Sequence, residues 1–151
     1  MTSVQNISRN VQLHLLLLFT CFLLIIIPAV NKTPTAQVSE KSLRAAAQFL
    51  LLVDTEEYAK SWETTADLLK KMLPQKAWKE QITKIRSFLG PIIERMQHDI
   101  AYTSSASDVP EGEYVILTFI SRFELRERVI ETITLMLSED DQWQVVGYFL
   151  K

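Results

Sequence analysis

The last third of the chain contains three apolar runs separated by short charged stretches. The runs are Tyr114 to Phe123, Val129 to Leu137 and Trp143 to Leu150. Glu124 to Arg128 and Glu139 to Asp141 are too polar for a core and mark turns between the runs. Runs rich in β-branched and aromatic residues predict strands, and connections this short permit antiparallel pairing only. We therefore expect a β-meander at the C-terminal end.

The first of these runs is apolar on both faces of the predicted strand. Alternate positions carry the following apolar side chains: Val115, Leu117, Phe119 and Phe123 on one face, and Tyr114, Ile116 and Ile120 on the other. This pattern is typical of a central strand that is covered on both sides. If the helices of the chain supply one layer, a second copy of the chain or a protein partner is the candidate for the other.

Upstream of the sheet, apolar residues recur at three- and four-residue steps and predict three amphipathic helices. The segments are Glu40 to Val53, Tyr58 to Met72, and Pro74 to Leu89. Ser39 is the expected N-cap of the first helix, Asp54 or Thr55 that of the second, and Gly90 ends the third.

From Ile92 onward the apolar period changes from helical to alternating. One parity holds Met96, His98, Ile100 and Tyr102, and the other holds Arg95, Gln97, Asp99 and Ala101. We expect a further strand with the second parity facing solvent. Helices followed by strands predict one α+β domain over residues 39–151, with helices packed on an antiparallel meander of about four strands.

The N-terminal region has a different character. Leu13 to Val30 is almost unbroken in its apolar character, and Arg9 is the only charged side chain before Lys32. Its length lies between a signal-peptide core of ~7–15 residues and the ~20 residues of a membrane-spanning helix. We expect residues 1–30 to be a signal anchor or a cleaved signal peptide, and residues 31–38 to be a linker. The domain would then lie in the periplasm, either tethered to the inner membrane by one span or released.

Several classes of chemistry find no support in the residues. Beyond the apolar run there are 15 basic and 18 acidic residues, a balance that argues against nucleic acid as a partner. The sole cysteine, Cys21, lies within the apolar run, and His98 is the only histidine beyond it. We expect no metal, no cofactor and no disulfide within the domain.

Glu131 is the main polar candidate, because it shares its parity with apolar residues of its strand. A carboxylate on a covered face must find a partner or stay protonated. Arg86, Arg95 and Arg122 are the available cations, and a structural glutamate–arginine ion pair is the first interpretation.

The alternative interpretation is a cone-shaped pocket in which Glu131 performs acid–base chemistry with His98 or Asp99. Trp62 and Tyr102, with the arginines, would line this pocket. If there is no such pocket, we expect the same residues to belong to a buried polar network or to the core.

The chain resembles the bacterial domain-of-unknown-function family 4019 from about Leu43 to Lys151. The residues that carry the resemblance are Asp54, Tyr58, Ser61, Trp62, Trp78, Arg86, Leu89, Gly90, Arg95, Pro110, Gly112, Tyr114, Phe119, Phe123, Glu131, Thr132, Trp143, Gly147 and Tyr148. The resemblance implies an exported or membrane-anchored protein of Gram-negative bacteria without an assigned activity. It also suggests a cystatin-like or nuclear-transport-factor-like cone. Where the family has Asp-Gly in the last hairpin, this chain has Asp140-Asp141, so Asp141 is expected in the left-handed conformation.

Two functions follow as expectations. The first is a non-enzymatic, membrane-tethered module that binds a protein partner or a second copy of itself. The second is a small-ligand-binding or lyase/isomerase-like protein that uses Glu131 with His98 or Asp99.

Overall fold

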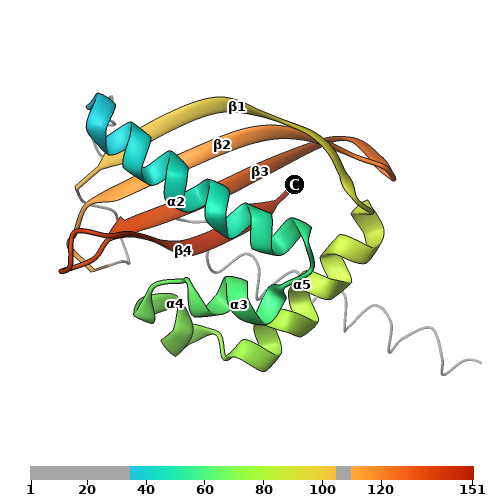
Figure 1. Cartoon of the computed structure of the whole chain (residues 1–151), viewed down its shortest axis with the longest axis horizontal. Coiled ribbons are helices and arrows are strands. Elements are labelled where there is room, and N and C mark those ends of the chain that lie inside the picture. The colour runs from blue at the N-terminus through green and yellow to red at the C-terminus, as the bar shows by residue number, and fades with distance from the viewer. Residues whose placement is uncertain (1–34, 105–109) are drawn as a thin grey trace, which may run out of the picture.

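The computed structural model describes residues 35–104 and 110–151, which form four helices followed by four strands (Figure 1). The elements are α2 (Ala36–Asp54), α3 (Tyr58–Glu63), α4 (Asp67–Met72), α5 (Gln75–Leu89), β1 (Ile92–Thr103), β2 (Tyr114–Phe123), β3 (Arg126–Leu137) and β4 (Trp143–Leu150). The expected membrane segment, Leu13 to Val30, lies outside the described residues. Within them, every helix is too short or too polar to cross a bilayer.

The strands form one antiparallel sheet in the order β1-β2-β3-β4, which confirms the α+β class and the predicted meander. β2 and β3 are central, and β1 and β4 are the edges. α2 lies across one face of this sheet, while α3, α4 and α5 lie beyond the edge formed by β4 (Figure 1).

The first helix begins earlier than expected. Thr35, and not Ser39, is its N-cap, and the Thr35 hydroxyl accepts a hydrogen bond from the backbone N–H of Val38 at 3.3 Å. The expected linker over residues 31–38 is therefore helical from Ala36 onward. The first turn forms because a threonine cap satisfies one of the free N–H groups at a helix start.

The predicted second helix is wrong as a single element. Thr64, Thr65 and Ala66 interrupt it and separate α3 from α4. At this break Thr65 forms a parallel bridge with Val145, and the N–H of Ala66 donates to the carbonyl of Val145 at 2.9 Å. Pairing with the edge of the sheet replaces helical hydrogen bonds here. The expected cap is also wrong, because Glu57 precedes α3 and makes no side-chain cap.

The face assignment of the first strand is wrong for half of its length. A β-bulge between Gln97 and Asp99 inserts one extra residue, His98. A one-residue insertion reverses the parity of the strand. Arg95 consequently lies opposite Ser121 on the face that the helices cover, while Met96 lies opposite Ile120 on the other face and is 56% exposed.

The expected double cover of β2 is also only partly present. Val115, Leu117 and Phe119 are buried under the helices, whereas Ile116, Thr118 and Ile120 of the opposite face are half-buried. β2 is thus central, but it is fully enclosed on one side only.

The main core lies between α2 and the covered face of the sheet. The α2 residues Phe49 and Val53 have at most 1% exposure and pack in one cluster with Leu117, Ile133 and Leu135 of the central strands. Phe49 also meets the ring of Tyr148 edge-on at 5.5 Å between centroids. Burying these apolar surfaces is the main stabilising contribution of the α2–sheet contact.

Three described residues have positive φ, and each lies in a connection: Glu56 between α2 and α3, Gly90 after α5, and Asp141 between β3 and β4. Asp141 has φ of 58° in the β3–β4 turn, which confirms the expected left-handed conformation. Gly90 has φ of 72° and ends α5 immediately before β1. Glycine adopts this region without the Cβ clash that other residues meet.

Candidate functional site

Glu131 lies at the centre of the covered face and has no exposed surface. Each of the other strands supplies one donor to its carboxylate. The Arg95 guanidinium of β1 donates to both oxygens, the Ser121 hydroxyl of β2 donates to Oε2 at 2.5 Å, and the Tyr148 hydroxyl of β4 donates to Oε1 at 2.6 Å. Four hydrogen bonds fill the acceptor capacity of the carboxylate.

A second carboxylate, at the end of α2, extends the network toward the helices. Asp54 accepts two hydrogen bonds from Arg95, at 2.7 and 3.1 Å, and one from Arg86 of α5 at 3.0 Å. The Arg86 guanidinium also lies over the Phe123 ring at 4.7 Å, within the range of a cation–π contact. Two carboxylates and two guanidinium groups thus balance one another within the interior.

Burial and charge act in opposite directions on Arg95. Burial by itself lowers the pKa of a guanidinium, but the hydrogen bonds and negative charges of Asp54 and Glu131 outweigh it and raise the pKa of Arg95. Burial, followed by the charge of Glu131, raises the pKa of the Tyr148 hydroxyl well above its ordinary value. Both donors therefore keep their protons at neutral pH.

This arrangement favours a structural role for the network. Glu131 has no surface through which a substrate would approach, and every acceptor site on its carboxylate is already used. A general base must reach the proton that it abstracts. The expected glutamate–arginine ion pair is present, and Arg95, rather than Arg86 or Arg122, makes it.

The other candidate residues lie apart from Glu131. His98 and Asp99 are exposed at the bulge of β1. Tyr102 is half-buried near the far end of β1, where partial burial and a hydrogen bond to Glu113 raise its pKa. The Trp62 indole N–H donates to the carbonyl of Leu73 at 2.7 Å, so Trp62 fixes the α4–α5 connection.

Arg122 pairs at the surface with Glu94 at 3.5 Å. Among residues 35–104 and 110–151, no cluster of three His, Cys, Asp or Glu side chains is placed to hold a metal ion.

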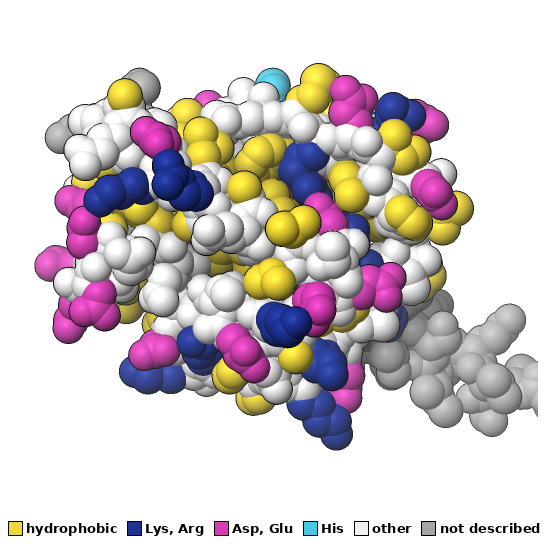
Figure 2. Space-filling model, in the orientation of Figure 1, with side chains coloured by type: hydrophobic (Ala, Val, Ile, Leu, Met, Phe, Trp, Pro, Cys, Tyr) yellow, Lys and Arg dark blue, Asp and Glu magenta, His cyan; other side chains and the backbone are white. Residues whose placement is uncertain are grey.

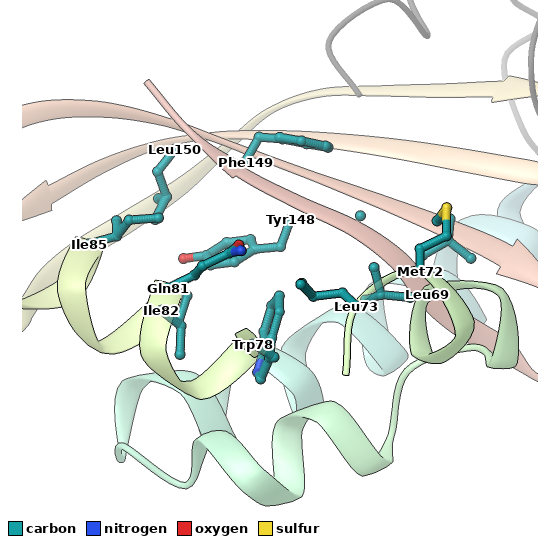
Figure 3. A pocket seen from close by; sticks show the side chains of 12 residues that line it. Leu69, Met72, Leu73, Trp78, Gln81, Ile82, Ile85, Tyr148, Phe149 and Leu150 are labelled. Carbon is teal, nitrogen blue, oxygen red and sulfur yellow. The ribbon is translucent and has the colours of Figure 1, made fainter. Parts of the chain in front are cut away.

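Sequence reasoning did not identify a groove that lies between β4 and the helices beyond its edge (Figure 3). Its volume is about 330 Å³, within the ~300–1,000 Å³ of small-ligand sites. Its lining residues are Leu69, Met72, Leu73, Trp78, Gln81, Ile82, Ile85, Val146, Gly147, Tyr148, Phe149 and Leu150. The signal in the sequence was a set of apolar helix residues that looked like ordinary core.

The groove is apolar but not sealed. Gln81 and Ile85 of α5 and Leu150 of β4 are half-buried, and Met72 of α4 is 48% exposed. Three lining side chains carry polar groups: Tyr148 donates to Glu131, Trp78 donates its indole N–H to Ser61 at 3.0 Å, and Gln81 adds a half-buried amide. Such a surface suits an apolar ligand with a small polar component, and it offers no nucleophile or proton-transfer pair.

The fold is a small α+β domain, in which four helices precede an antiparallel four-stranded sheet. The family model described as "Protein of unknown function (DUF4019)" matches residues 45–148, and the chain belongs to this family. Searches of curated proteins and of solved structures returned no match.

Proposed function

We propose that the protein is a non-enzymatic binding module, and that the groove between β4 and the α4–α5 helices is its binding site. The observation that carries this proposal is an apolar groove that remains accessible beside an edge strand. A folded domain ordinarily closes such a surface, so an accessible one favours a ligand or partner. The acid–base alternative is disfavoured because Glu131 is enclosed by its four hydrogen bonds.

The groove can be tested with the full-length chain in lipid nanodiscs and a set of fluorinated apolar fragments, using fluorine NMR. Empty nanodiscs provide the blank for partition into lipid. Ile85→Trp fills the groove, whereas Phe88→Trp enlarges an exposed side chain on the same helix, outside the lining. We expect fragment binding to be lost in Ile85→Trp and kept in Phe88→Trp. Equal binding by both variants, or no binding above the blank, would overturn the proposal.

The module is proposed to act in the periplasm, attached to the inner membrane through Leu13 to Val30 or released after cleavage. The support is the apolar segment itself, which is followed by a domain rich in charged residues. A C-terminal alkaline phosphatase fusion should be active, because that enzyme requires an oxidising compartment to fold. Intact mass measurement then distinguishes the tethered form from the cleaved form. An inactive fusion that is nevertheless expressed would place the domain in the cytoplasm and refute this location.

A further inference from the structure

The edge of β4 that borders the groove carries backbone groups of Tyr148 and Leu150 that no other strand of residues 35–104 and 110–151 pairs with. At the end of the sheet, Ile130 and Lys151 exchange both hydrogen bonds, at 2.7 and 2.9 Å. Antiparallel pairs alternate between hydrogen-bonded and non-hydrogen-bonded positions. Tyr148 and Leu150, which lie opposite Ile133 and Glu131, are therefore in non-hydrogen-bonded pairs and direct their N–H and C=O groups away from β3.

The chain itself already adds a segment to this edge. Thr65 pairs with Val145 in parallel orientation, and Ala66 donates a backbone hydrogen bond to the Val145 carbonyl at 2.9 Å. The segment then leaves the sheet, because α4 begins at Asp67. From Val146 to Leu150, β4 has β3 as its only strand neighbour within the described residues. The groove continues along this part of the edge, so an added strand would extend a pairing that already exists.

Resting on the proposed function, we infer that the groove takes an extended apolar peptide segment of a partner protein, added as a strand to the edge of β4. Its backbone would pair with the outward groups of Tyr148 and Leu150. Alternate side chains would contact the apolar wall that Ile82 and Ile85 form on α5. This mode of recognition joins main-chain hydrogen bonds with side-chain pockets at every second residue.

The backbone of β4 decides between a peptide and an acyl chain. An acyl chain in the groove would displace water from the N–H and C=O groups of Tyr148 and Leu150 without replacing the lost hydrogen bonds. Buried backbone groups without partners are costly. A peptide strand supplies a donor and an acceptor at the required spacing, so it is the occupant that the edge favours.

Charge complementarity indicates acidic residues beside the apolar segment. The stretch from Asp67 to Leu89 contains five lysines but only two acidic residues. Lys71 and Lys84 are exposed, adjoin the lining residues Met72 and Ile85 in sequence, and take part in no ion pair within the described residues. In Figure 2, Lys and Arg side chains lie over α3, α4 and α5 with Asp and Glu side chains among them, so the charge argument rests on Lys71 and Lys84. Acidic flanks would be attracted to this rim.

The test uses the full-length chain in nanodiscs and fluorescein-labelled synthetic peptides, followed by fluorescence anisotropy. The parent peptide has alternating Val and Thr residues between two pairs of Glu residues. Two derivatives carry N-methyl groups on the odd or on the even amides, which blocks one hydrogen-bonding edge while the side chains are kept. A third replaces the Glu pairs by Lys, and a fluorescent fatty acid serves as the alternative ligand.

We expect the parent peptide to bind, one N-methylated derivative to lose roughly tenfold or more in affinity, and the other to bind like the parent. The Lys-flanked peptide should bind more weakly, and this difference should shrink at high salt. Binding should be lost in Ile85→Trp and kept in Phe88→Trp. Equal effects of the two methylation patterns would overturn strand addition.

The two proposals fail in distinguishable ways. If apolar fragments or the fatty acid bind in the groove and the parent peptide does not, the peptide inference is refuted while the groove remains a binding site. If neither class binds, both are refuted. If the protein self-associates without peptide and Ile85→Trp abolishes this association, the occupant is a second copy of the chain, and the partner-peptide inference is wrong.

Discussion

Glu131 receives side-chain hydrogen bonds from all three other strands, through Arg95, Ser121 and Tyr148. Replacing it with glutamine keeps its shape but removes the fully buried one of the two negative charges in the network, since the Asp54 side chain is 15% exposed. Arg86 and Arg95 then share the single carboxylate of Asp54. Breaking a buried ion pair in this way costs about 3 kcal/mol or more. We expect Glu131→Gln to lose this amount in urea unfolding of the full-length chain, followed by tryptophan fluorescence.

The matched control is Glu94→Gln at the surface. Glu94 pairs with Arg122 at 3.5 Å, and both side chains are largely exposed. Exposed pairs contribute roughly 0–1 kcal/mol, so the control should change stability little. Similar losses for the two variants would contradict a special role of the buried network.

Tyr148 makes the stability of the domain depend on pH in the alkaline range. Its pKa is raised in the folded state, so the folded protein holds this proton at pH values where the unfolded chain, with a tyrosine pKa of about 10, releases it. Stability from this group is complete below about pH 10 and is lost as pH rises further. Tyr148→Phe should be less stable than the wild type at pH 7 by about 1.5 kcal/mol, because a hydrogen bond to a carboxylate is lost.

Urea unfolding at a series of pH values measures this difference in the free energy of unfolding. The difference between the wild type and Tyr148→Phe should narrow between about pH 9 and about pH 11, around the pKa of tyrosine in the unfolded chain. Burial also raises the pKa values of Tyr58 and Tyr114. Both residues are present in the wild type and in Tyr148→Phe, so the stability that they cost as pH rises is the same in the two proteins. A difference that stays constant over this range would show that Tyr148 ionises as readily in the folded state as in the unfolded one.

At the scale of elements, the β3–β4 hairpin contains a residue in an unfavourable conformation. Asp141 has positive φ, and its carboxylate pairs with Lys41 at 2.8 Å at an exposed position. Glycine relieves the backbone strain, while the exposed ion pair contributes little. We expect Asp141→Gly to raise the free energy of unfolding by about 0.5 kcal/mol. Asp140 is not in the left-handed conformation, so Asp140→Gly in the same turn relieves no strain and should leave stability unchanged or lower it. If Asp140→Gly were more stable than Asp141→Gly, the turn assignment would be contradicted.

The α5–β1 junction depends on a glycine. A Cβ at Gly90 would lie 3.2 Å from Leu125 Cγ and 3.3 Å from Glu124 Cβ, and the residue has positive φ. Gly90→Ala should therefore destabilise the domain by about 1–2 kcal/mol in thermal or urea unfolding. At Gly112 the nearest atom to an added Cβ is 3.6 Å away, so Gly112→Ala should be tolerated. Equal stability of the two variants would contradict the strain at the junction.

Element boundaries were predictable where local signals and tertiary structure agree. β2 and β4 coincide with their apolar runs, and α5 ends before Gly90 as its sequence indicates. β3 begins at Arg126 instead of Val129, so part of the charged stretch expected as a turn is strand. The break between α3 and α4 was not predictable, because Thr65 fits the helical period and leaves it only to pair with Val145. A long-range hydrogen bond decided this position against the local preference.

The bulge at His98 had a larger consequence for the site. Alternation in the sequence placed Arg95 on the solvated face, but the extra residue turns Arg95 inward, where it reaches Glu131 and Asp54. Bulges leave little mark in a single sequence, because any residue of suitable size can occupy them. The need of Glu131 for a partner was predictable from its parity, whereas the identity and geometry of that partner were not.

At the scale of the whole molecule, the arrangement of layers creates the groove. α2 covers one face of the sheet, and the α3–α5 helices lie beyond the β4 edge (Figure 1). Trp78 of α5 joins the same core as Phe49, with ring centroids 5.9 Å apart, so α5 is held to α2 on one side. Its other side faces β4 across the groove. Because α5 lies beside the β4 edge and is not stacked on the face of the sheet, the groove stays open between the two elements.

The sequence by itself determined the α+β class, the strand meander, the strained turn at Asp141 and the presence of a carboxylate that requires a buried partner. These properties follow from residue periodicity, turn chemistry and the cost of burying charge, all of which act over a few neighbouring residues. Only the tertiary structure decided that Arg95 is the partner, that a face of β2 stays partly exposed, and that a groove opens beside β4. Each of these depends on contacts between segments far apart in the chain, which no local pattern encodes.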